Sequence, residues 1–203
     1  MDIFRCFPQD TEVIVVDDCS TDPEVSDGLT WWKTNLLEGR LRVFVNNENC
    51  GFLRTANFGV TKATNELVVL ISNDVKINDR SIGSKLVGAV CCDDDGVFAG
   101  ARLLDYDTGW NTFNGVTYPY LEGWLLAFWR SWWIKLGGFD ERYAPYDFED
   151  VDLSTTVKAS GGKLVQVDLD AVHLGAQTYK YSLDRENQTK KNQEKFKNKW
   201  ITN

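Results

Sequence analysis

Short apolar runs alternate with helix-length stretches along the first half of the chain. Runs rich in β-branched residues occupy positions 13–16, 41–45 and 67–71, and each is bounded by polar or turn-forming residues. Two stretches of helical length, 23–37 and 54–64, lie between them. This alternation predicts strands joined by right-handed helical crossovers. We therefore expect an α/β fold with a mixed, mainly parallel central sheet flanked by helices.

The second half of the chain is less regular. Its apolar runs predict further strands, and paired glycines predict the ends of two helices. The expected strands are 97–104, 121–130 and 163–167, and the expected helices are 130–136, 148–159 and a polar C-terminal helix at about 184–200. The sequence contains no linker and no repeat, so we expect a single domain over residues 1–203.

Composition and charge narrow the possible functions. The 203 residues are 43% hydrophobic and 26% charged, as in ordinary globular proteins. The net charge is -8, although residues 185–203 are basic. An acidic body repels phosphate backbones, so we expect no nucleic-acid binding. Any ligand that carries phosphates needs a metal ion or backbone amides to hold it.

Cysteine usage and hydropathy bear on the compartment. The five cysteines are an odd number without CxxC spacing, and no secretory signal precedes them. We therefore expect a reduced, cytoplasmic protein. No apolar run approaches the roughly 20 residues of a membrane span. In the basic C-terminal helix, Phe196 and Trp200 permit two interpretations: peripheral contact with an anionic membrane, or docking of the helix on the body.

Polar residues follow the predicted strands, where ligands of open α/β sheets bind. Asp17 and Asp18 are suited to accept hydrogen bonds from a nucleobase or a ribose, whereas helix capping explains Ser20 but not two adjacent acids. Asn73 and Asp74 follow the third strand. A single carboxylate there suits a divalent cation that also binds diphosphate, and an ordinary Asx turn is the structural alternative.

Three carboxylates lie within four residues at the start of a predicted helix. Glu149, Asp150 and Asp152 are each favoured there by the helix dipole. Their mutual repulsion is expected to raise at least one pKa toward the range of a general base. A lone histidine after a strand is more often a structural residue than a ligand. The sole histidine, His173, is nevertheless also a candidate for a second metal ligand.

Glycine and tryptophan supply the remaining candidates. Gly51 permits close approach of the backbone to a ligand at a helix start, near Asn57. The loop matches neither GxGxxG nor a Walker motif, which excludes the usual dinucleotide and P-loop sites. Trp124 belongs to an aromatic cluster between residues 106 and 148 that is either core or a platform for a sugar ring.

Taken together and in this order, the motifs resemble family 2 glycosyltransferases of the GT-A fold, most closely the rhamnosyltransferase-type branch. The resemblance covers about residues 12–177. The motifs that carry it are Asp17-Asp18-Cys-Ser-Thr-Asp22, Asn47-Glu-Asn49-Cys-Gly51-Phe with Asn57 and Gly59, Leu70-Ile-Ser72-Asn73-Asp74-Val, Leu136-Gly-Gly-Phe-Asp140-Glu, Phe148-Glu149-Asp150-Val-Asp152-Leu and His173-Leu-Gly175.

The resemblance implies transfer of a sugar, with inversion, from a nucleotide-diphosphate donor to a hydroxyl acceptor such as a glycan. A UDP-sugar is the first expectation for the donor, and Mn²⁺ or Mg²⁺ for the cofactor. Residues 1–105 then form the nucleotide-binding half, and 106–180 the acceptor and catalytic half. The implied roles are nucleotide-sugar binding by Asp17, Asp18, Ser20, Gly51, Asn57, Asn73 and Trp124, metal binding by Asp74 and His173, and catalytic base by Asp150 or, less favoured, Glu149.

Two features depart from the family pattern. Ser72 stands where the family often has the first aspartate of its DxD motif. The family also opens with a strand that has no counterpart here, because residues 2–7 resemble the helix that follows it. A catalytically inactive nucleotide- or carbohydrate-binding module is therefore the alternative function. A sugar nucleotidyltransferase is weaker, since no Gly-rich basic loop opens the chain.

Overall fold

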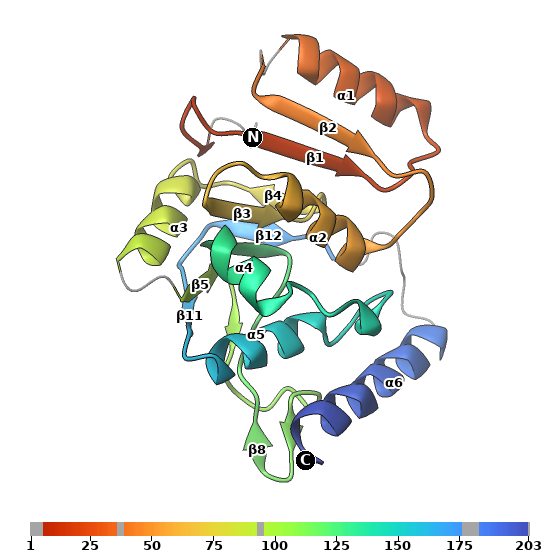
Figure 1. Cartoon of the computed structure of the whole chain (residues 1–203), viewed down its shortest axis with the longest axis vertical. Coiled ribbons are helices and arrows are strands. Elements are labelled where there is room, and N and C mark those ends of the chain that lie inside the picture. Colours follow the sequence, from red (N-terminus) through yellow and green to blue (C-terminus); the bar gives the residue numbers. More distant parts are fainter. Residues whose placement is uncertain (1–5, 36–38, 93–95, 176–182, 203) are drawn as a thin grey trace.

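The computed structural model describes residues 6–35, 39–92, 96–175 and 183–202. A four-stranded sheet forms its centre (Figure 1). The strand order is β11 (Lys163–Gln166), β5 (Val97–Gly100), β10 (Leu125–Trp129) and β3 (Leu67–Ile71). The helix expected over residues 2–7 falls mostly outside the described residues.

Strand β10 is antiparallel to both of its neighbours, β3 and β5, whereas β11 and β5 are parallel. The four-stranded sheet is therefore less parallel than the alternating pattern of the first half suggested. Two consecutive strands can be parallel neighbours only if a crossover of a dozen or more residues, usually a helix, connects them. The segment between β5 and β10 holds only short strands and no helix, so the chain enters β10 in the opposite direction.

A second sheet consists of β1 (Val13–Asp17) and β2 (Leu41–Val45), which are parallel and joined through α1 (Pro23–Asn35). Among the described residues, neither strand is hydrogen-bonded to the four-stranded sheet. The pair lies with α1 at the top of the view in Figure 1. Helix α2 (Phe52–Lys62) packs against both β1 and β3 and so connects the two sheets.

Side chains of β10 alternate between two hydrophobic cores. Leu126 and Phe128 lie in one core, and Leu125 and Ala127 lie in the other. All four are at most 2% exposed. Alternate residues of a strand point to opposite faces of the sheet. The continuous apolar run of β10 is therefore that of a strand covered on both sides.

Helices cover the two faces of the sheet. On one face, the first core includes Leu53 of α2, Trp133 of α4 (Arg130–Leu136) and Val157 of α5 (Glu149–Ala159). On the other face, α3 (Ile82–Cys91) contributes Ile82 and Leu86, which are both fully buried. Helices α2, α4 and α5 begin and end within two residues of the positions that the sequence predicts, whereas α3 was not predicted.

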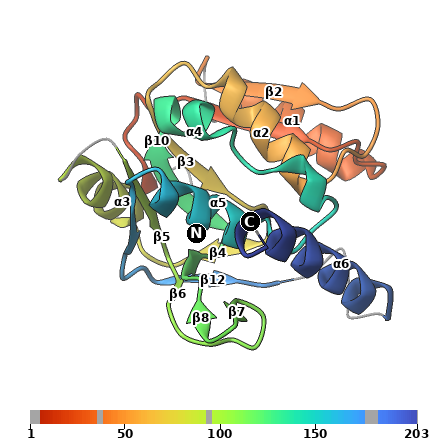
Figure 2. The same ribbon diagram turned by 60° about the horizontal axis from the view of Figure 1, so that its bottom comes forward.

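Short ladders complete the fold and were not predicted from the sequence. The strands expected over 97–104 and 121–130 are each split in two, because β6 and β9 leave the main sheet to pair with each other. Figure 2 shows the β7–β8 hairpin extending from the body. The additional elements are β4 (Val75–Ile77), β6 (Leu103–Leu104), β7 (Thr112–Phe113), β8 (Val116–Thr117), β9 (Tyr120–Leu121), β12 (Ala171–His173) and the 3₁₀ helix Glu141–Tyr143.

The predicted C-terminal helix is confirmed as α6 (Leu183–Trp200), and it packs beside α5 in both views (Figures 1 and 2). Phe196 is fully buried in the first core, and the Asn192 side chain is also fully buried. Asn192 donates to the backbone carbonyls of Tyr143, Tyr146 and Asp147. None of the described helices is both long and apolar enough to cross a membrane.

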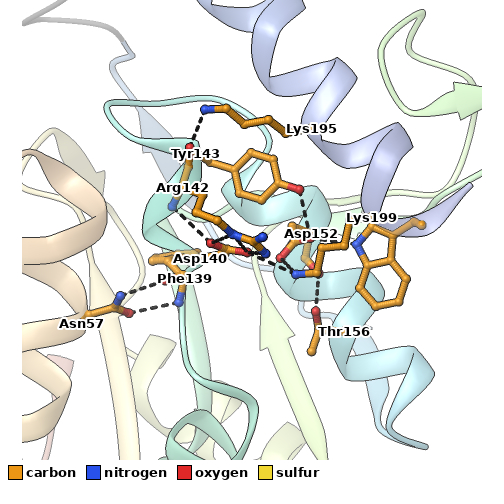
Figure 3. Close-up of polar contacts among 10 residues, drawn as sticks. Asn57, Phe139, Asp140, Arg142, Tyr143, Asp152, Thr156, Lys195 and Lys199 are labelled. Carbon is orange, nitrogen blue, oxygen red and sulfur yellow. Dashed lines mark hydrogen bonds and ion pairs between the residues drawn. The ribbon is translucent and has the colours of Figure 1, made fainter. Parts of the chain in front are cut away.

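One buried carboxylate joins α6 to α5 (Figure 3). Asp152 is 2% exposed, and its Oδ2 accepts a hydrogen bond from Lys199 Nζ at 2.8 Å. Its Oδ1 accepts from Trp200 Nε1 at 2.7 Å and from the Tyr143 hydroxyl at 3.1 Å. A buried carboxylate that lacks such partners is costly. The three contacts explain why this acid is tolerated in the interior.

We predict that Asp152→Ala lowers the free energy of unfolding by more than about 2 kcal/mol, because it leaves the Trp200 and Tyr143 donors without their acceptor. Urea unfolding measures this change. The matched control is Glu194→Ala in α6, which removes an exposed ion pair with Lys197 and is expected to cost less than about 1 kcal/mol. Equal effects of the two substitutions would contradict this account of α6.

Candidate active site

The first acidic pair follows β1, and its two members make different contacts. Asp17 Oδ1 accepts a hydrogen bond from the backbone N–H of Ser20 at 3.2 Å and another from the Ser20 hydroxyl. These contacts close a local turn before α1. Ser20 is exposed, and Asp17 is only partly buried. Both side chains lie where the sequence predicts a nucleotide-binding edge, and their binding role stays a prediction.

Asp18 holds the loop that leads into α2. Its Oδ1 accepts from Asn46 Nδ2 and from the Cys50 N–H, both at 2.8 Å, and its Oδ2 accepts from the Gly51 N–H at 2.8 Å. Partial burial raises the pKa of Asp18, but these hydrogen bonds outweigh burial and lower it. Gly51 has φ 80°, a left-handed conformation that favours glycine. The carboxylate therefore shapes this loop from within.

Asn57 of α2 makes a two-point contact with the chain after α4 (Figure 3). Its Nδ2 donates to the Phe139 carbonyl at 2.8 Å, and its Oδ1 accepts from the Phe139 N–H at 3.0 Å. A Cβ on Gly138 would overlap the Asn57 and Trp133 side chains, so only glycine fits there. In the structure both ends of the Asn57 amide join the two halves of the chain, and nucleotide binding by this residue stays a prediction.

Asp74 and His173 come together across an antiparallel ladder that the sequence did not reveal. Strand β12 pairs with β4 so that His173 lies opposite Val75, and the Leu174 N–H donates to the Asp74 carbonyl. The His173 Nε2 and Asp74 Oδ1 atoms are 3.1 Å apart. Their side chains are 35% and 18% exposed, so both remain accessible. Asn73 is exposed in the turn before β4.

Trp124 lies directly against this pair. Its ring stacks on the His173 imidazole with centroids 5.4 Å apart and planes 13° from parallel. The Ser72 N–H donates to the Trp124 carbonyl at 2.9 Å, which extends the pairing of β3 with β10. Trp124 is only 9% exposed. This ring therefore packs on the imidazole, and contact with a sugar stays a prediction.

The predicted base region lies at the start of α5. Asp150 Oδ1 accepts from the Val151 N–H at 2.8 Å, and the backbone of Gly123 also hydrogen-bonds to its carboxylate. Burial, followed by the negative charges of Glu122 and Asp147, raises the pKa of Asp150 to about 7. A carboxyl group with this pKa is suited to general-base chemistry near neutral pH.

Glu149 differs from its neighbour. Burial and the charge of Asp150 raise the pKa of Glu149 well above its ordinary value. Among the described residues, its buried Oε2 atom has no hydrogen-bond partner. The protonated form of Glu149 is therefore more favoured than that of an ordinary glutamate. This environment favours Asp150 over Glu149 as the group that accepts a proton.

Helix α6 fixes the backbone that precedes these two acids. Asp147 and Phe148 both have positive φ, 68° and 77°, which is unfavourable for residues other than glycine. The Asp147 carboxylate accepts from Arg185 at 3.0 Å and from the Thr189 hydroxyl at 2.6 Å. The C-terminal helix thus supports the conformation from which Asp150 projects.

Two residues near Asp150 were missed by the sequence analysis. Glu122 lies between β9 and β10, forms an ion pair with Arg102 at 3.2 Å, and accepts a hydrogen bond from Trp124 Nε1 at 2.7 Å. Tyr120 is also close, since burial and then the charge of Asp150 raise the pKa of its phenol. An acid within the apolar run 120–129 was the available sequence signal.

Residues 3–152 match the family described as Glycosyl transferase family 2. The chain belongs to this family. The match spans more than half of the 203 residues and includes both strand-end motifs and the acids at the start of α5. No curated protein sequence matches this family 2 chain.

Solved structures support the GT-A fold for this family 2 chain. GalNAc-T7 with UDP, GalNAc and Mn²⁺ is similar with a TM-score of 0.72 and 17% identity, over 95% of this chain and 42% of the other. The mannosyltransferase PcManGT from Pyrobaculum calidifontis, in complex with GDP-Man and Mn²⁺, is similar with a TM-score of 0.59 and 26% identity. This similarity covers 78% of this chain and 46% of the other. The family 2 chain thus spans less than half of either protein.

The donor atoms of Asp74 and His173 fit a divalent ion that is held jointly with a diphosphate. No group of three or more His, Cys, Asp or Glu side chains within the described ranges is placed to hold an ion on protein ligands alone. One carboxylate and one imidazole are ligands that Mn²⁺ accepts. Mg²⁺-type ions commonly combine one or two carboxylates with substrate phosphates. The fit is therefore to an ion that the nucleotide helps to bind.

We predict that Asp150→Asn stabilises the folded family 2 chain at pH 7–8. Because the pKa of Asp150 is about 7 in the folded state and 3.8 ordinarily, the unfolded chain ionises first. Stability therefore falls as pH rises from about 4 to 7, by at most about 4 kcal/mol. The substitution removes this loss, so its gain in unfolding free energy grows across that window and vanishes near pH 4.

Chemical unfolding at pH 4, 6 and 8 measures this gain. The control is Asp27→Asn on the exposed surface of α1, which is expected to follow the wild-type curve at each pH. A gain for Asp150→Asn that does not change between pH 4 and pH 8 would show that the carboxyl is not held protonated in the folded state.

Proposed function

We propose that this chain is an inverting glycosyltransferase domain that transfers a hexosyl or deoxyhexosyl group from a nucleotide-diphosphate sugar to a hydroxyl acceptor. A UDP-sugar is the donor that we place first, and a glycan is the acceptor class. Family membership supports the reaction type. The solved relatives, named with UDP or GDP-Man and with Mn²⁺, support a nucleotide-sugar donor and a divalent metal.

One observation carries the proposal. The Asp74 carboxylate and the His173 imidazole are 3.1 Å apart, and a continuous set of contacts joins them to Asp150. Trp124 stacks on His173, and the neighbouring Gly123 bonds through its backbone to Asp150. The two residues proposed to bind the metal ion and a carboxyl group with a pKa of about 7 therefore lie in one region.

The residues have distinct roles in the proposed reaction. Asp74 and His173 hold the divalent ion, which when bound stabilises negative charge on the departing diphosphate. Asp150 accepts the proton of the acceptor hydroxyl. The acceptor oxygen then bonds to the anomeric carbon on the face opposite the diphosphate, and the bond from that carbon to the diphosphate oxygen breaks with its electron pair. The products are an inverted glycoside and a nucleoside diphosphate.

We also propose that the chain is of the rhamnosyltransferase-like branch. Among the described residues, the β1–β2 pair is separated from the four-stranded sheet, with no strand hydrogen-bonded to both. The same separation favours the second candidate function, a nucleotide- or carbohydrate-binding module without activity. In that case, Asp18 and Asn57 would serve mainly to hold the fold together through their hydrogen bonds within the chain.

We propose a reducing compartment, the cytoplasm, because the five cysteines are an odd number and have no CxxC spacing. Of the two interpretations of the C-terminal helix, we propose docking on the body. Phe196 is fully buried, and Trp200 Nε1 donates a hydrogen bond to Asp152. The two aromatic residues that suggested membrane contact therefore contact other parts of the protein instead.

Turnover of nucleotide sugars tests the proposed reaction. With Mn²⁺ and a panel of UDP-, GDP- and dTDP-sugars, we expect nucleotide release from at least one donor, rising with pH through about 7 as Asp150 ionises. Asp150→Asn is expected to lower this rate at least about 100-fold, and the surface control Asp27→Asn to leave it unchanged. Nucleotide binding without turnover of any donor would favour the inactive module.

A further inference from the structure

Glu122 is tied to the indole of Trp124 by a short hydrogen bond. The Trp124 Nε1 atom donates to Glu122 Oε2 at 2.7 Å. A buried indole N–H usually needs a partner, and an ionised acceptor makes the stronger bond. Arg102 pairs with the other carboxylate oxygen, Oε1, at 3.2 Å. The Glu122 side chain is thus held at both oxygens, and it limits rotation of the indole.

The indole in turn covers one face of the His173 imidazole. The two rings are nearly parallel, 13° apart, with centroids separated by 5.4 Å. This separation is within the range of favourable ring stacking. A stacked neighbour restricts rotation of the imidazole about its side-chain bonds. His173 Nε2 is thereby kept directed at Asp74, 3.1 Å away.

Backbone pairing leaves the ring orientation as the main freedom at this site. The β4–β12 ladder places His173 opposite Val75, and the Ser72 N–H donates to the Trp124 carbonyl. The main chains that carry Asp74, Trp124 and His173 are therefore fixed relative to one another. The His173 side chain is nevertheless 35% exposed, so solvent offers its ring an alternative direction.

We propose that Glu122 is a positioning residue for the metal-binding imidazole of His173 and acts through the indole of Trp124. The proposal rests on the function proposed above, because it assumes that Asp74 and His173 bind the divalent ion. It places Glu122 in contact with the indole that packs on the imidazole, rather than in contact with the ion.

Mn²⁺ binding in the presence of UDP tests this role without activity. The free Mn²⁺ signal in electron paramagnetic resonance gives the affinity. His173 is the only histidine, so broadening of its single set of imidazole NMR signals reports whether the ion binds beside it. We expect Glu122→Ala and Trp124→Phe each to weaken Mn²⁺ binding about 10-fold, as for other supporting contacts of metal ligands.

Two further variants separate positioning from a general structural role. Glu122→Gln retains an oxygen that accepts from the indole N–H, so we expect Mn²⁺ affinity within about 2-fold of wild type. Because Glu122 and Trp124 act in series, the double variant with alanine and phenylalanine is expected to be no weaker than either single variant. Trp124→Phe keeps an aromatic ring in the core, so it still tests the positioning role if Glu122→Ala does not fold.

The possible results distinguish failure of the positioning role from failure of the proposed metal site. Wild-type affinity in Trp124→Phe, additive losses in the double variant, or equal losses in Glu122→Gln and Glu122→Ala would overturn the positioning role while leaving the metal site intact. Absence of imidazole broadening in the wild-type protein would instead overturn the proposed metal site, and the positioning role with it.

Discussion

Burial of β10 on both faces is the constraint on which the rest of the structure depends. Its apolar side chains alternate between two cores, so a shift of one residue would exchange the two sets. The register with β3, in which Leu125 lies opposite Ile71, is consequently fixed. The residues just before β10 inherit that register, and this places Trp124 next to Ser72 and the turn that carries Asp74.

The same arrangement brings together two groups with different electrostatic requirements: a pair of side chains suited to a cation, and a carboxyl group that is kept from ionising. The protein is acidic, with a net charge of -8, and so offers little electrostatic attraction to a diphosphate. In the proposed function, a divalent ion held by Asp74 and His173 would supply the missing positive charge. A short distance away, burial keeps Asp150 from ionising until the pH approaches about 7. The stability lost by keeping this carboxyl there is the expected cost of a functional site.

Much of the fold follows from the sequence because its signals are local. The apolar runs of β1, β2 and β3, the intervening helices and the glycines that end α4 each depend on neighbours in the chain. The β4–β12 ladder could not be predicted, because its two short strands are almost one hundred residues apart and carry little apolar pattern. The roles of Asp18 and Asn57 inside the chain were missed for the same reason: their partners are set by tertiary contacts.

We propose that Asp74 and His173 jointly hold a divalent ion with the donor diphosphate, and the positioning role of Glu122 depends on this site. Crystals grown with UDP and Mn²⁺ test it most directly, through the anomalous scattering of manganese. We expect one strong peak within bonding distance of an Asp74 carboxylate oxygen, His173 Nε2 and the UDP diphosphate. A manganese peak beside Glu149 and Asp150, or UDP bound with no manganese near His173, would contradict it.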